Sequence, residues 1–278
     1  MNKIVSYVHL TRPINWVIGG GSIFMGAFIA GSIRPLGHVI LAMISGMCIA
    51  GGANSINDYF DVNIDRINKP YRPIPSGNVT KQGAYRFALI MFLLGIIISL
   101  FINAGAFAIA VVASIILYAY SAWLKRTVLW GNMTVSLITA FAFIYGGVAV
   151  DLLDIAMIPA IFSFFFNFGL EIIKDIEDMN GDACDGARTM PLVYGKKRSL
   201  GLVTLIFCFL IVITYIPYIM GIFGKCYLYV VSIGVNLVLM YTMISFWFDS
   251  SSKHLGRLST LLKIDMLIGL IAIFVGRF

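Results

Sequence analysis

The segment LGHVILAMISGMCIAGGANSINDYFDVNID, residues 36–65, is apolar over most of its length and ends in an acidic stretch. A helix needs roughly 20 mainly apolar residues to cross a bilayer, and the segment supplies them before Asn57. Asp58, Asp61 and Asp65 then follow at spacings of three and four residues, which place side chains on one face of a helix. The segment therefore predicts a transmembrane helix that carries a row of carboxylates at one end.

Eight more apolar runs of similar length occur along the chain. With the first they cover residues 14–33, 36–60, 83–103, 105–123, 129–150, 155–176, 199–222, 226–248 and 259–276. The composition agrees, because 60% of the residues are hydrophobic and only 12% are charged, against about 25% in a soluble domain. A transmembrane barrel would show short segments of alternating polarity instead. We predict an all-α integral membrane protein with nine transmembrane helices.

The distribution of basic residues predicts the orientation in the membrane. If the nine segments alternate in direction, every Lys and Arg except Arg34, Lys225 and Arg277 lies on the same side as the N-terminus. Cytoplasmic loops carry the excess of basic residues in membrane proteins. We therefore expect a multi-pass protein of the cell membrane with a cytoplasmic N-terminus. The net charge of +7 is explained by this rule and indicates no nucleic-acid partner.

A second acidic segment lies 117 residues after the first and repeats its spacing. Both segments read D-x-x-D-x-N-x-D, and the shift pairs Asp58 with Asp175, Asp61 with Asp178, Asn63 with Asn180 and Asp65 with Asp182. Glu171, Glu177 and Asp185 also lie in the second segment. The pattern predicts an internal repeat of two four-helix units, with the ninth helix added. The other acids, Asp151, Asp154, Asp249 and Asp265, are expected to be ordinary charges at helix ends or in loops.

The two segments have the chemistry of a magnesium site. Asn54, Asn57 or Asp58, Asp61 and Asp65 form one polar stripe on a helix, and Glu171, Asp175, Asp178 and Asp182 form another. Carboxylate and amide oxygens are hard ligands that suit Mg²⁺. Lys174 lies between two of the acids and is expected to neutralise its neighbours. A single acidic helix end would be read as solvated, but two with one spacing favour a function.

Basic loops follow both segments and suit a phosphate ligand. The loops cover residues 66–82 and 183–198, at the end of the molecule predicted to be cytoplasmic. The candidate diphosphate ligands are Arg66, Lys69 and Arg72 in the first loop, Arg188 in the second, and Lys125 and Arg126 in a tight loop between the fourth and fifth predicted helices. Arginine binds phosphate oxygens through two parallel hydrogen bonds. A single basic residue would be read as a topology determinant that faces lipid headgroups, but convergence with the acidic stripes strengthens the functional reading for Arg72, Lys125 and Arg188.

Metal ions and bases around a diphosphate would stabilise the charge on a departing diphosphate. An allylic group that lost its diphosphate would need an apolar chamber with aromatic walls, and Tyr118 and Tyr120 are among the candidates. A cation-coupled transporter is the alternative of another class. Transporter sites lie near the bilayer midplane, whereas these carboxylates lie at helix ends, so an enzyme is favoured.

The motifs together resemble the UbiA superfamily of intramembrane prenyltransferases. The matching stretches are TRPINW (residues 11–16), which contains Arg12 and Asn15, then NDYFDVNID, NKPYRPIPSG, YSAWLKR and KDIEDMNGD. The resemblance implies one prenyltransferase domain over residues 1–278, a central cavity, two Mg²⁺ ions and a prenyl diphosphate donor. It implies that Asp61, Asp65, Asp178 and Asp182 bind the metal, that Asn57 and Lys125 complete the catalytic set, and that the two basic loops cap the diphosphate.

Within the superfamily, the length and the first motif with its loop are most similar to archaeal members of lipid synthesis. These transfer a geranylgeranyl group from geranylgeranyl diphosphate to geranylgeranylglyceryl phosphate, which gives digeranylgeranylglyceryl phosphate. Members with aromatic or tetrapyrrole acceptors, in quinone, haem and chlorophyll pathways, share the aspartates and remain the alternative. The residues alone predict only a prenyl diphosphate, Mg²⁺, membrane lipids and a lipophilic acceptor. No obligatory protein partner is expected.

Overall fold

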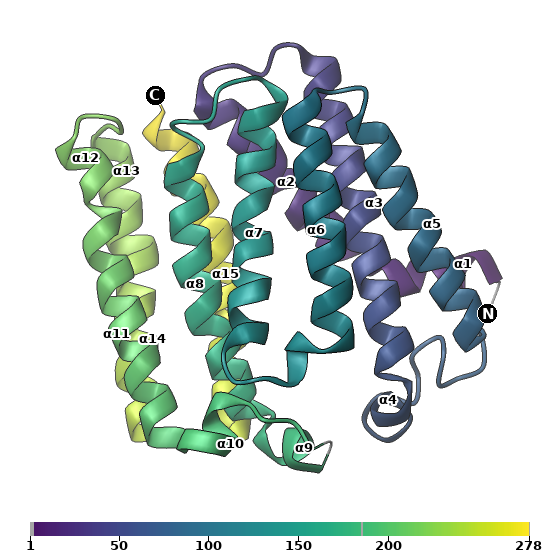
Figure 1. The fold of residues 1–278 in the computed structure, drawn as a ribbon. Coiled ribbons are helices and arrows are strands. Elements are labelled where there is room, and N and C mark those ends of the chain that lie inside the picture. Colours follow the sequence, from purple (N-terminus) through teal and green to yellow (C-terminus); the bar gives the residue numbers. More distant parts are fainter. Residues whose placement is uncertain (1–2, 185, 278) are drawn as a thin grey trace. The chain divides into compact units, whose positions relative to one another are not determined.

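The computed structural model describes residues 3–184 and 186–277, and over these residues the chain contains helices and no β-strand. Nine of the described segments are long and apolar enough to cross a membrane. They are α2 (Pro13–Ala30), α3 (Leu36–Phe60), α5 (Lys81–Ser99), α6 (Ala104–Ala122), α7 (Trp130–Ala149), α8 (Met157–Glu177), Lys196–Ile219, Lys225–Phe248 and α15 (Ser252–Gly276) (Figure 1). The prediction of an all-α membrane protein with nine spans is confirmed.

Short helices join or extend these spans. The seventh span consists of α11 (Lys196–Thr214) and α12 (Ile216–Ile219), and the eighth of α13 (Lys225–Val230), the π-helical η2 (Val231–Asn236) and α14 (Leu237–Phe248). The remaining elements are α1 (Lys3–Thr11), α4 (Val62–Asn68), the 3₁₀-helix η1 (Leu124–Arg126), α9 (Met179–Cys184) and α10 (Met190–Tyr194). Two of the short helices, α4 and α9, directly follow the acidic ends of α3 and α8.

The ninth span begins seven residues earlier than predicted, at Ser252 instead of residue 259. The side chain of Ser251 accepts a hydrogen bond from the backbone N–H of His254 and so caps the first turn. As a consequence Asp265 lies in the middle of α15, where it is 1% exposed and its carboxylate oxygens have no hydrogen-bond partner among the described residues. The expectation that Asp265 is an ordinary end-of-helix charge is wrong, because hydropathy patterns do not locate a helical cap.

The chain forms two compact units. Unit 1 comprises Met1–Lys125 and Phe141–Ala156, and unit 2 comprises Arg126–Ala140 and Met157–Phe278. The fifth span, α7, therefore contributes its first half to unit 2 and its second half to unit 1. The first acidic motif, residues 58–65, lies wholly in unit 1, and the second acidic motif, residues 175–182, lies wholly in unit 2.

In unit 1, α3 is the central helix and packs against α1, α2, α5 and α6. Helix α2 and the second half of α7 approach each other so closely that only glycine fits at the contact. A Cβ atom on Gly26 would lie 2.1 Å from the carbonyl oxygen of Phe143, and one on Gly146 would lie 1.9 Å from that of Ile23. These contacts fix the position of α2, the helix that begins directly after Arg12.

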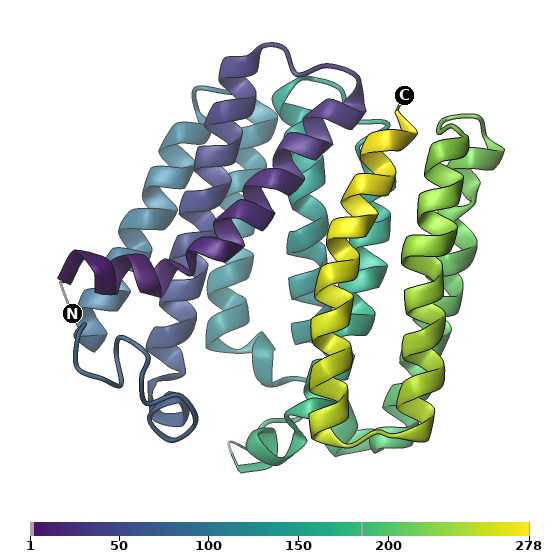
Figure 2. The same cartoon turned by 180° about the vertical axis from the view of Figure 1, so that it is seen from behind.

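In unit 2, α8 packs against α11 and α15, and α15 also contacts η2, α13 and α14. Figure 2 shows α15 in yellow beside the green hairpin that α11 to α14 form. Gly169 of α8 leaves room for the ring of Phe207, whose nearest atom would be 2.2 Å from an added Cβ. The buried Tyr227 hydroxyl donates to the carbonyl of Thr214 at 2.6 Å. Helix α8, which carries the second motif, is therefore held by α11 and α15.

Local geometry supports the internal repeat at the predicted shift of 117 residues. Arg12 and Leu129, which are 117 residues apart, both have positive φ, 53° and 61°, directly before α2 and α7. Helix α3 ends at Phe60 and α4 begins at Val62, whereas α8 ends at Glu177 and α9 begins at Met179. Both breaks lie at the second aspartate of the motif, with the same 117-residue offset. The repeat therefore includes the conformation of the backbone around the two motifs as well as their acidic residues.

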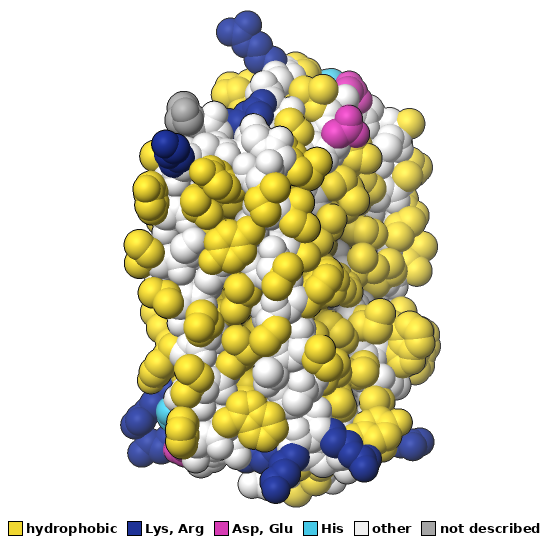
Figure 3. Space-filling view, turned by 90° about the vertical axis from the view of Figure 1, so that its left-hand side faces the viewer, with side chains coloured by type: hydrophobic (Ala, Val, Ile, Leu, Met, Phe, Trp, Pro, Cys, Tyr) yellow, Lys and Arg dark blue, Asp and Glu magenta, His cyan; other side chains and the backbone are white. Residues whose placement is uncertain are grey.

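The outer side of the α11–α14 hairpin is a continuous hydrophobic surface (Figure 3). Leu205 and Val212 on α11, and Tyr241 on α14, are all more than half exposed. Lys and Arg side chains gather at the ends of this surface and are absent from its middle in the view of Figure 3. Apolar side chains over the middle of a helix and basic ones at its ends suit a hydrocarbon layer with polar headgroups on either side.

Candidate active site

The first acidic motif lies where α3 ends and α4 begins. Asp61 stands between the two helices with φ −84° and ψ 2°, and its backbone N–H still bonds to the carbonyl of Asn57 at 2.9 Å. The chain therefore continues almost as one helix, which keeps residues four apart on one face. The side-chain amide of Asn57 donates to the Asp61 carboxylate, also at 2.9 Å. The predicted polar stripe is present in unit 1.

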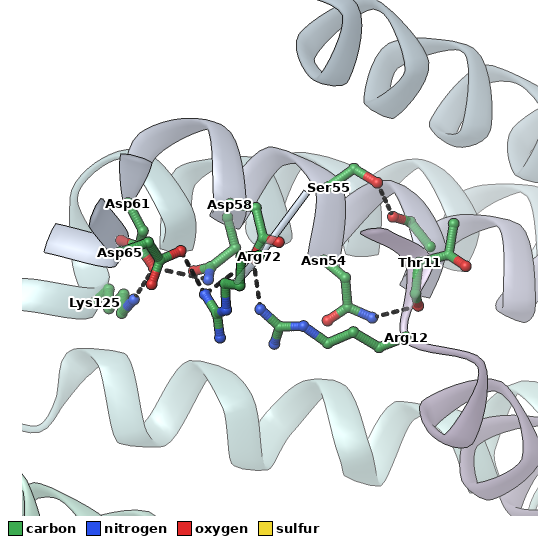
Figure 4. A network of polar contacts seen from close by, with 11 residues as sticks. Thr11, Arg12, Asn54, Ser55, Asp58, Asp61, Asp65, Arg72 and Lys125 are labelled. Carbon is green, nitrogen blue, oxygen red and sulfur yellow. Dashed lines mark hydrogen bonds and ion pairs between the residues drawn. The ribbon is translucent and has the colours of Figure 1, made fainter. Parts of the chain in front are cut away.

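Three basic residues pair with the three aspartates of this motif (Figure 4). Asp58, Asp61 and Asp65 are each at most 5% exposed. Arg12 donates to Asp58 at 2.6 Å, Arg72 donates to Asp65 at 2.6 Å and to Asp58 at 3.2 Å, and Lys125 pairs with Asp61. Two buried carboxylates would repel each other without these cations. The network therefore keeps the charges of a crowded acidic site balanced.

Each basic residue reaches the motif from a different element. Arg12 lies at the bend between α1 and α2, and the amide of Asn54 on α3 donates to the carbonyl of Thr11 at 2.9 Å, which fixes that bend. Arg72 comes from the loop after α4, and Lys125 comes from η1 after α6. Segments far apart in sequence thus converge on the end of α3, as Figure 4 shows.

The surroundings of Arg72 keep its side chain charged. Burial by itself would lower the pKa of Arg72, but the carboxylates of Asp58 and Asp65 outweigh burial and raise that pKa above its ordinary value. The guanidinium has donors in a rigid planar fork, and Asp58 and Asp65 use one of its terminal nitrogens. A phosphate oxygen could occupy the other donors or take the place of a carboxylate.

The second motif, in unit 2, is more exposed than the first. Asp178 lies between α8 and α9 and is exposed, and Asp182 is one turn further on and partly exposed. Asp175 accepts a hydrogen bond at 2.8 Å from the amide of Asn132 on α7. Lys174 forms an ion pair with Glu171 at 2.5 Å, and its neutralising role stays a prediction.

Two predicted diphosphate ligands are brought together in unit 2. The backbone N–H of Arg188 donates to the backbone carbonyl of Arg126 at 2.9 Å, and both side chains are exposed. In unit 1, Arg66 and Lys69 are exposed beside the first motif. Asp185 lies outside the described residues. All four of these basic residues are thus exposed.

Of the two predicted aromatic residues, Tyr118 lies in an aromatic cluster of unit 1. Tyr118 of α6 packs against Phe60 of α3, with ring centroids 5.9 Å apart, and against Trp123 at 6.4 Å. Tyr120 also has an interaction partner. Asn15 stands at the start of α2, where its backbone N–H bonds to the Arg12 carbonyl at 2.9 Å. The role of these residues as cavity walls or supporting residues stays a prediction.

Sequence reasoning missed the roles of Asn132 and Glu177. Asn132 holds Asp175, and Glu177 contacts the start of α15. A signal for Asn132 was present, because the shift of 117 residues pairs it with Asn15, a residue already singled out. Glu177 corresponds to Phe60 under the same shift, so the repeat gave no sign of it.

The carboxylates fit a metal that shares its coordination with a ligand. In the part of the chain that the structure describes, no group of three or more His, Cys, Asp or Glu side chains is close enough to hold a metal ion by itself. Mg²⁺ is usually bound through one or two carboxylates and completes its octahedron with water and substrate phosphates. Asp61 and Asp65, with the oxygens of a diphosphate, match that donor set in kind.

Comparison with known proteins identifies the family. The model of the UbiA prenyltransferase family matches residues 21–263. Digeranylgeranylglyceryl phosphate synthase of Methanopyrus kandleri is 36% identical over 96% of this chain and 97% of its own length. The enzyme of the same name from Methanobrevibacter smithii is 36% identical, with 98% of both chains covered.

Solved structures agree. A structure of digeranylgeranylglyceryl phosphate synthase in membranes superimposes with a TM-score of 0.85 at 34% identity and covers 100% of this chain and 99% of that one. A UbiA homologue from Archaeoglobus fulgidus, bound to DMAPP and Mg²⁺, has the same fold with a TM-score of 0.75 at 19% identity, over 97% and 99% of the two chains. Because the family match covers most of the chain and the relatives align along nearly their whole length, this protein belongs to the UbiA prenyltransferase family.

Proposed function

We propose that this prenyltransferase transfers a geranylgeranyl group from geranylgeranyl diphosphate to the free hydroxyl of geranylgeranylglyceryl phosphate. The product is digeranylgeranylglyceryl phosphate, the doubly ethered lipid of archaeal membranes. The choice of acceptor is supported by the relatives named digeranylgeranylglyceryl phosphate synthase, which are 30–38% identical to this chain. Quinone-, haem- and chlorophyll-pathway acceptors remain the alternative within the family.

The observation that carries the proposal is the pairing of carboxylates with bases at the end of α3. Asp61 and Asp65 supply oxygen ligands for Mg²⁺, and Lys125 and Arg72, their present partners, are phosphate-binding residues. A metal-bound diphosphate satisfies both sets at once. The site therefore suits a ligand that is itself a complex of cation and anion.

Binding of this ligand involves an exchange of ion pairs. Arg72 leaves Asp65 and Lys125 leaves Asp61 as the carboxylates turn to Mg²⁺ and the bases turn to the diphosphate. Arg12 keeps its pair with Asp58, so one ion pair still joins α2 to α3. Since the bases occupy the carboxylates until a diphosphate arrives, metal and donor bind together more strongly than either binds alone.

The second motif takes part in the same chemistry. Asp178 and Asp182 supply further carboxylates for a second Mg²⁺, and Arg126 and Arg188 supply further donors for the diphosphate. The like geometry at Asp61 and Asp178 supports equal roles for the two motifs. Mg²⁺ held by these carboxylates would draw charge from the diphosphate oxygens and so make the diphosphate a better leaving group.

The reaction breaks the bond between the allylic carbon and the diphosphate oxygen, and diphosphate keeps the electron pair. A new bond forms between that carbon and the acceptor oxygen. The acceptor proton passes to the departing diphosphate or to a motif carboxylate. Lys125 and Arg72 hold the diphosphate as its charge grows, and an apolar surrounding keeps water from the carbon.

We also propose that the N-terminus and the acidic motifs face the cytoplasm. The basic residues of the loops at residues 66–82 and 183–198 support this orientation through the positive-inside rule. A prenyl diphosphate dissolved in the cytoplasm or its adjoining leaflet then reaches the motifs directly. Membrane lipids would surround the apolar outer face.

The proposed function is tested by transfer in detergent. Labelled geranylgeranyl diphosphate and geranylgeranylglyceryl phosphate should yield the diether and one pyrophosphate per transfer when Mg²⁺ is present. A chelator should stop both. Because detergent leaves no membrane gradient, pyrophosphate release excludes a purely transporting protein, and the absence of all release would contradict the proposal.

Arg72→Gln is expected to change metal binding and donor binding in opposite directions. Loss of the guanidinium frees Asp65, so Mg²⁺ alone should bind more tightly than to the unchanged protein. The donor loses a charged hydrogen bond, which is worth about 1.5–3 kcal/mol, so donor efficiency should fall roughly ten- to a hundredfold. Calorimetric titration with Mg²⁺, with and without donor, measures the two effects.

Arg86→Gln is the matched control, because Arg86 is an exposed arginine on α5. It should leave both affinities unchanged. If Arg72→Gln weakens the binding of Mg²⁺ alone, or alters only the affinity for the acceptor, the proposed exchange of ion pairs is wrong.

A further inference from the structure

The end of α8 is joined to the start of α15 through Glu177. The hydroxyl of Ser252 donates to the backbone carbonyl of Glu177 at 2.7 Å. The hydroxyl of Ser259 lies 3.3 Å from a carboxylate oxygen of Glu177, and it shares its single hydrogen between that oxygen and the carbonyl of Gly256, which is 3.1 Å away. The last carbonyls of a helix lack partners within that helix, so Ser252 satisfies one of them. Glu177 is thus held by both its backbone and its side chain.

A glycine on α15 makes room for the carboxylate. A Cβ atom on Gly256 would lie 2.6 Å from Oε1 of Glu177, closer than non-bonded atoms approach. The carboxylate therefore lies directly against the backbone of the first two turns of α15.

The contact lies within the second acidic motif, one residue before Asp178. Helix α8 ends at Glu177, Asp178 follows, and α9 begins at Met179. In unit 1 the equivalent break is held by ion pairs, in which Lys125 binds Asp61. Asp178 is exposed, so its place depends on the backbone around it. The fixed neighbour on its N-terminal side is Glu177.

We propose that Glu177 is a positioning residue for Asp178 and Asp182, which it holds for metal binding through its contact with α15. The inference rests on the proposed function, because it assumes that these two aspartates bind Mg²⁺ with the diphosphate. The carboxylate of Glu177 itself points toward Ser259 and Gly256 and is engaged in that contact. Outer groups that orient metal ligands typically change metal affinity ten- to a hundredfold when removed.

The test measures the Mg²⁺ requirement separately from turnover. The Mg²⁺ concentration that gives half of the full thermal stabilisation is measured with an unreactive phosphonate analogue of the prenyl diphosphate. Glu177→Ala should raise that concentration about tenfold, whereas kcat at saturating Mg²⁺ should stay within about twofold. Glu177→Gln should behave like the unchanged protein, because its amide oxygen still accepts from Ser259.

Gly256→Ala tests the same contact without altering Glu177. The added methyl group displaces only the far end of a flexible side chain, so the protein should fold. The Mg²⁺ requirement should rise as it does in Glu177→Ala. Gly201→Ala is the matched control on α11, because an added Cβ there has nothing within 4 Å. The double change at 177 and 256 should be no worse than Glu177→Ala alone.

Two results separate this inference from the proposed function. If Asp178→Asn abolishes Mg²⁺-dependent stabilisation but Glu177→Ala and Gly256→Ala lower only the melting temperature, Glu177 is merely structural and the inference is overturned. If Asp178→Asn itself leaves that stabilisation unchanged, the assignment of the second motif to the metal fails instead.

Discussion

Replacing Asp61 by asparagine is expected to reduce the rate of prenyl transfer about a thousandfold while the protein stays folded. Asparagine keeps the size of the side chain and can still accept the hydrogen bond from Asn57. It removes the charge that holds Mg²⁺, and loss of several kcal/mol of metal stabilisation corresponds to about three powers of ten in rate. Single-turnover transfer of labelled geranylgeranyl groups measures the effect. Circular dichroism and gel filtration in detergent check the fold.

The same loss is expected for Asp178→Asn, which changes an exposed residue and so should cost little stability. Groups that act as one unit are strongly non-additive, so the double variant should be only slightly slower than either single one. Asp154→Asn, in the exposed loop before α8, is the control and should keep the full rate. Near-normal turnover of either motif variant at limiting Mg²⁺ would remove that aspartate from the metal site.

A fluorinated geranylgeranyl diphosphate is expected to bind about as well as the normal donor and to react at least a hundredfold more slowly. Fluorine near the allylic carbon withdraws electrons and destabilises a developing carbocation. Every 1.36 kcal/mol added to the barrier slows the step tenfold, so a hundredfold effect needs less than about 3 kcal/mol. The expectation follows from the proposed site, in which Lys125 and Arg72 would hold the leaving group. No histidine belongs to the ion-pair network described for these two residues.

Single-turnover kinetics isolate the chemical step from slow release of a lipid product. Competition against the normal donor measures the affinity of the analogue and serves as the control. An unchanged rate of the chemical step would mean that the acceptor oxygen attacks before the old bond has broken. The prediction that a carbocation develops before the acceptor oxygen bonds to the carbon would then be wrong.

The membrane fold could be predicted from the sequence because one physical requirement dominates it. A backbone in hydrocarbon must satisfy its own hydrogen bonds, so apolar runs of sufficient length can only be helices. All nine apolar runs of the sequence correspond to membrane-spanning segments among the described residues. The boundary that failed, before α15, depends on the serine cap at Ser251, whose hydrogen bond a hydropathy pattern does not reveal. Asp265 was misjudged for the same reason.

The acidic motif and its register could also be predicted, because helical periodicity fixes which residues share a face. The basic partners of these aspartates could not be predicted from periodicity. Arg12 pairs with Asp58 from 46 residues away, through a bend with φ 53° at Arg12 that no local pattern indicates. The pairing of Lys125 with Asp61 depends likewise on how α6 ends beside α3. Such contacts depend on tertiary packing, which the spacing of residues in the sequence does not reveal.

The contact of Glu177 with α15 shows where an internal repeat stops being informative. The repeat predicts equal breaks at Asp61 and Asp178, and the structure has them. The residue before each break differs, Phe60 in one unit and Glu177 in the other. Only packing reveals that the second is held by Ser252 and Ser259.

Competition between acceptors tests the central claim most directly. The purified protein is given labelled geranylgeranyl diphosphate, Mg²⁺ and an equimolar mixture of geranylgeranylglyceryl phosphate, 4-hydroxybenzoate, haem and chlorophyllide, and the labelled products are separated by mass. The account predicts that the label enters digeranylgeranylglyceryl phosphate, that a chelator prevents it, and that Asp178→Asn protein gives almost none. Preferential labelling of 4-hydroxybenzoate, haem or chlorophyllide would contradict the proposed acceptor.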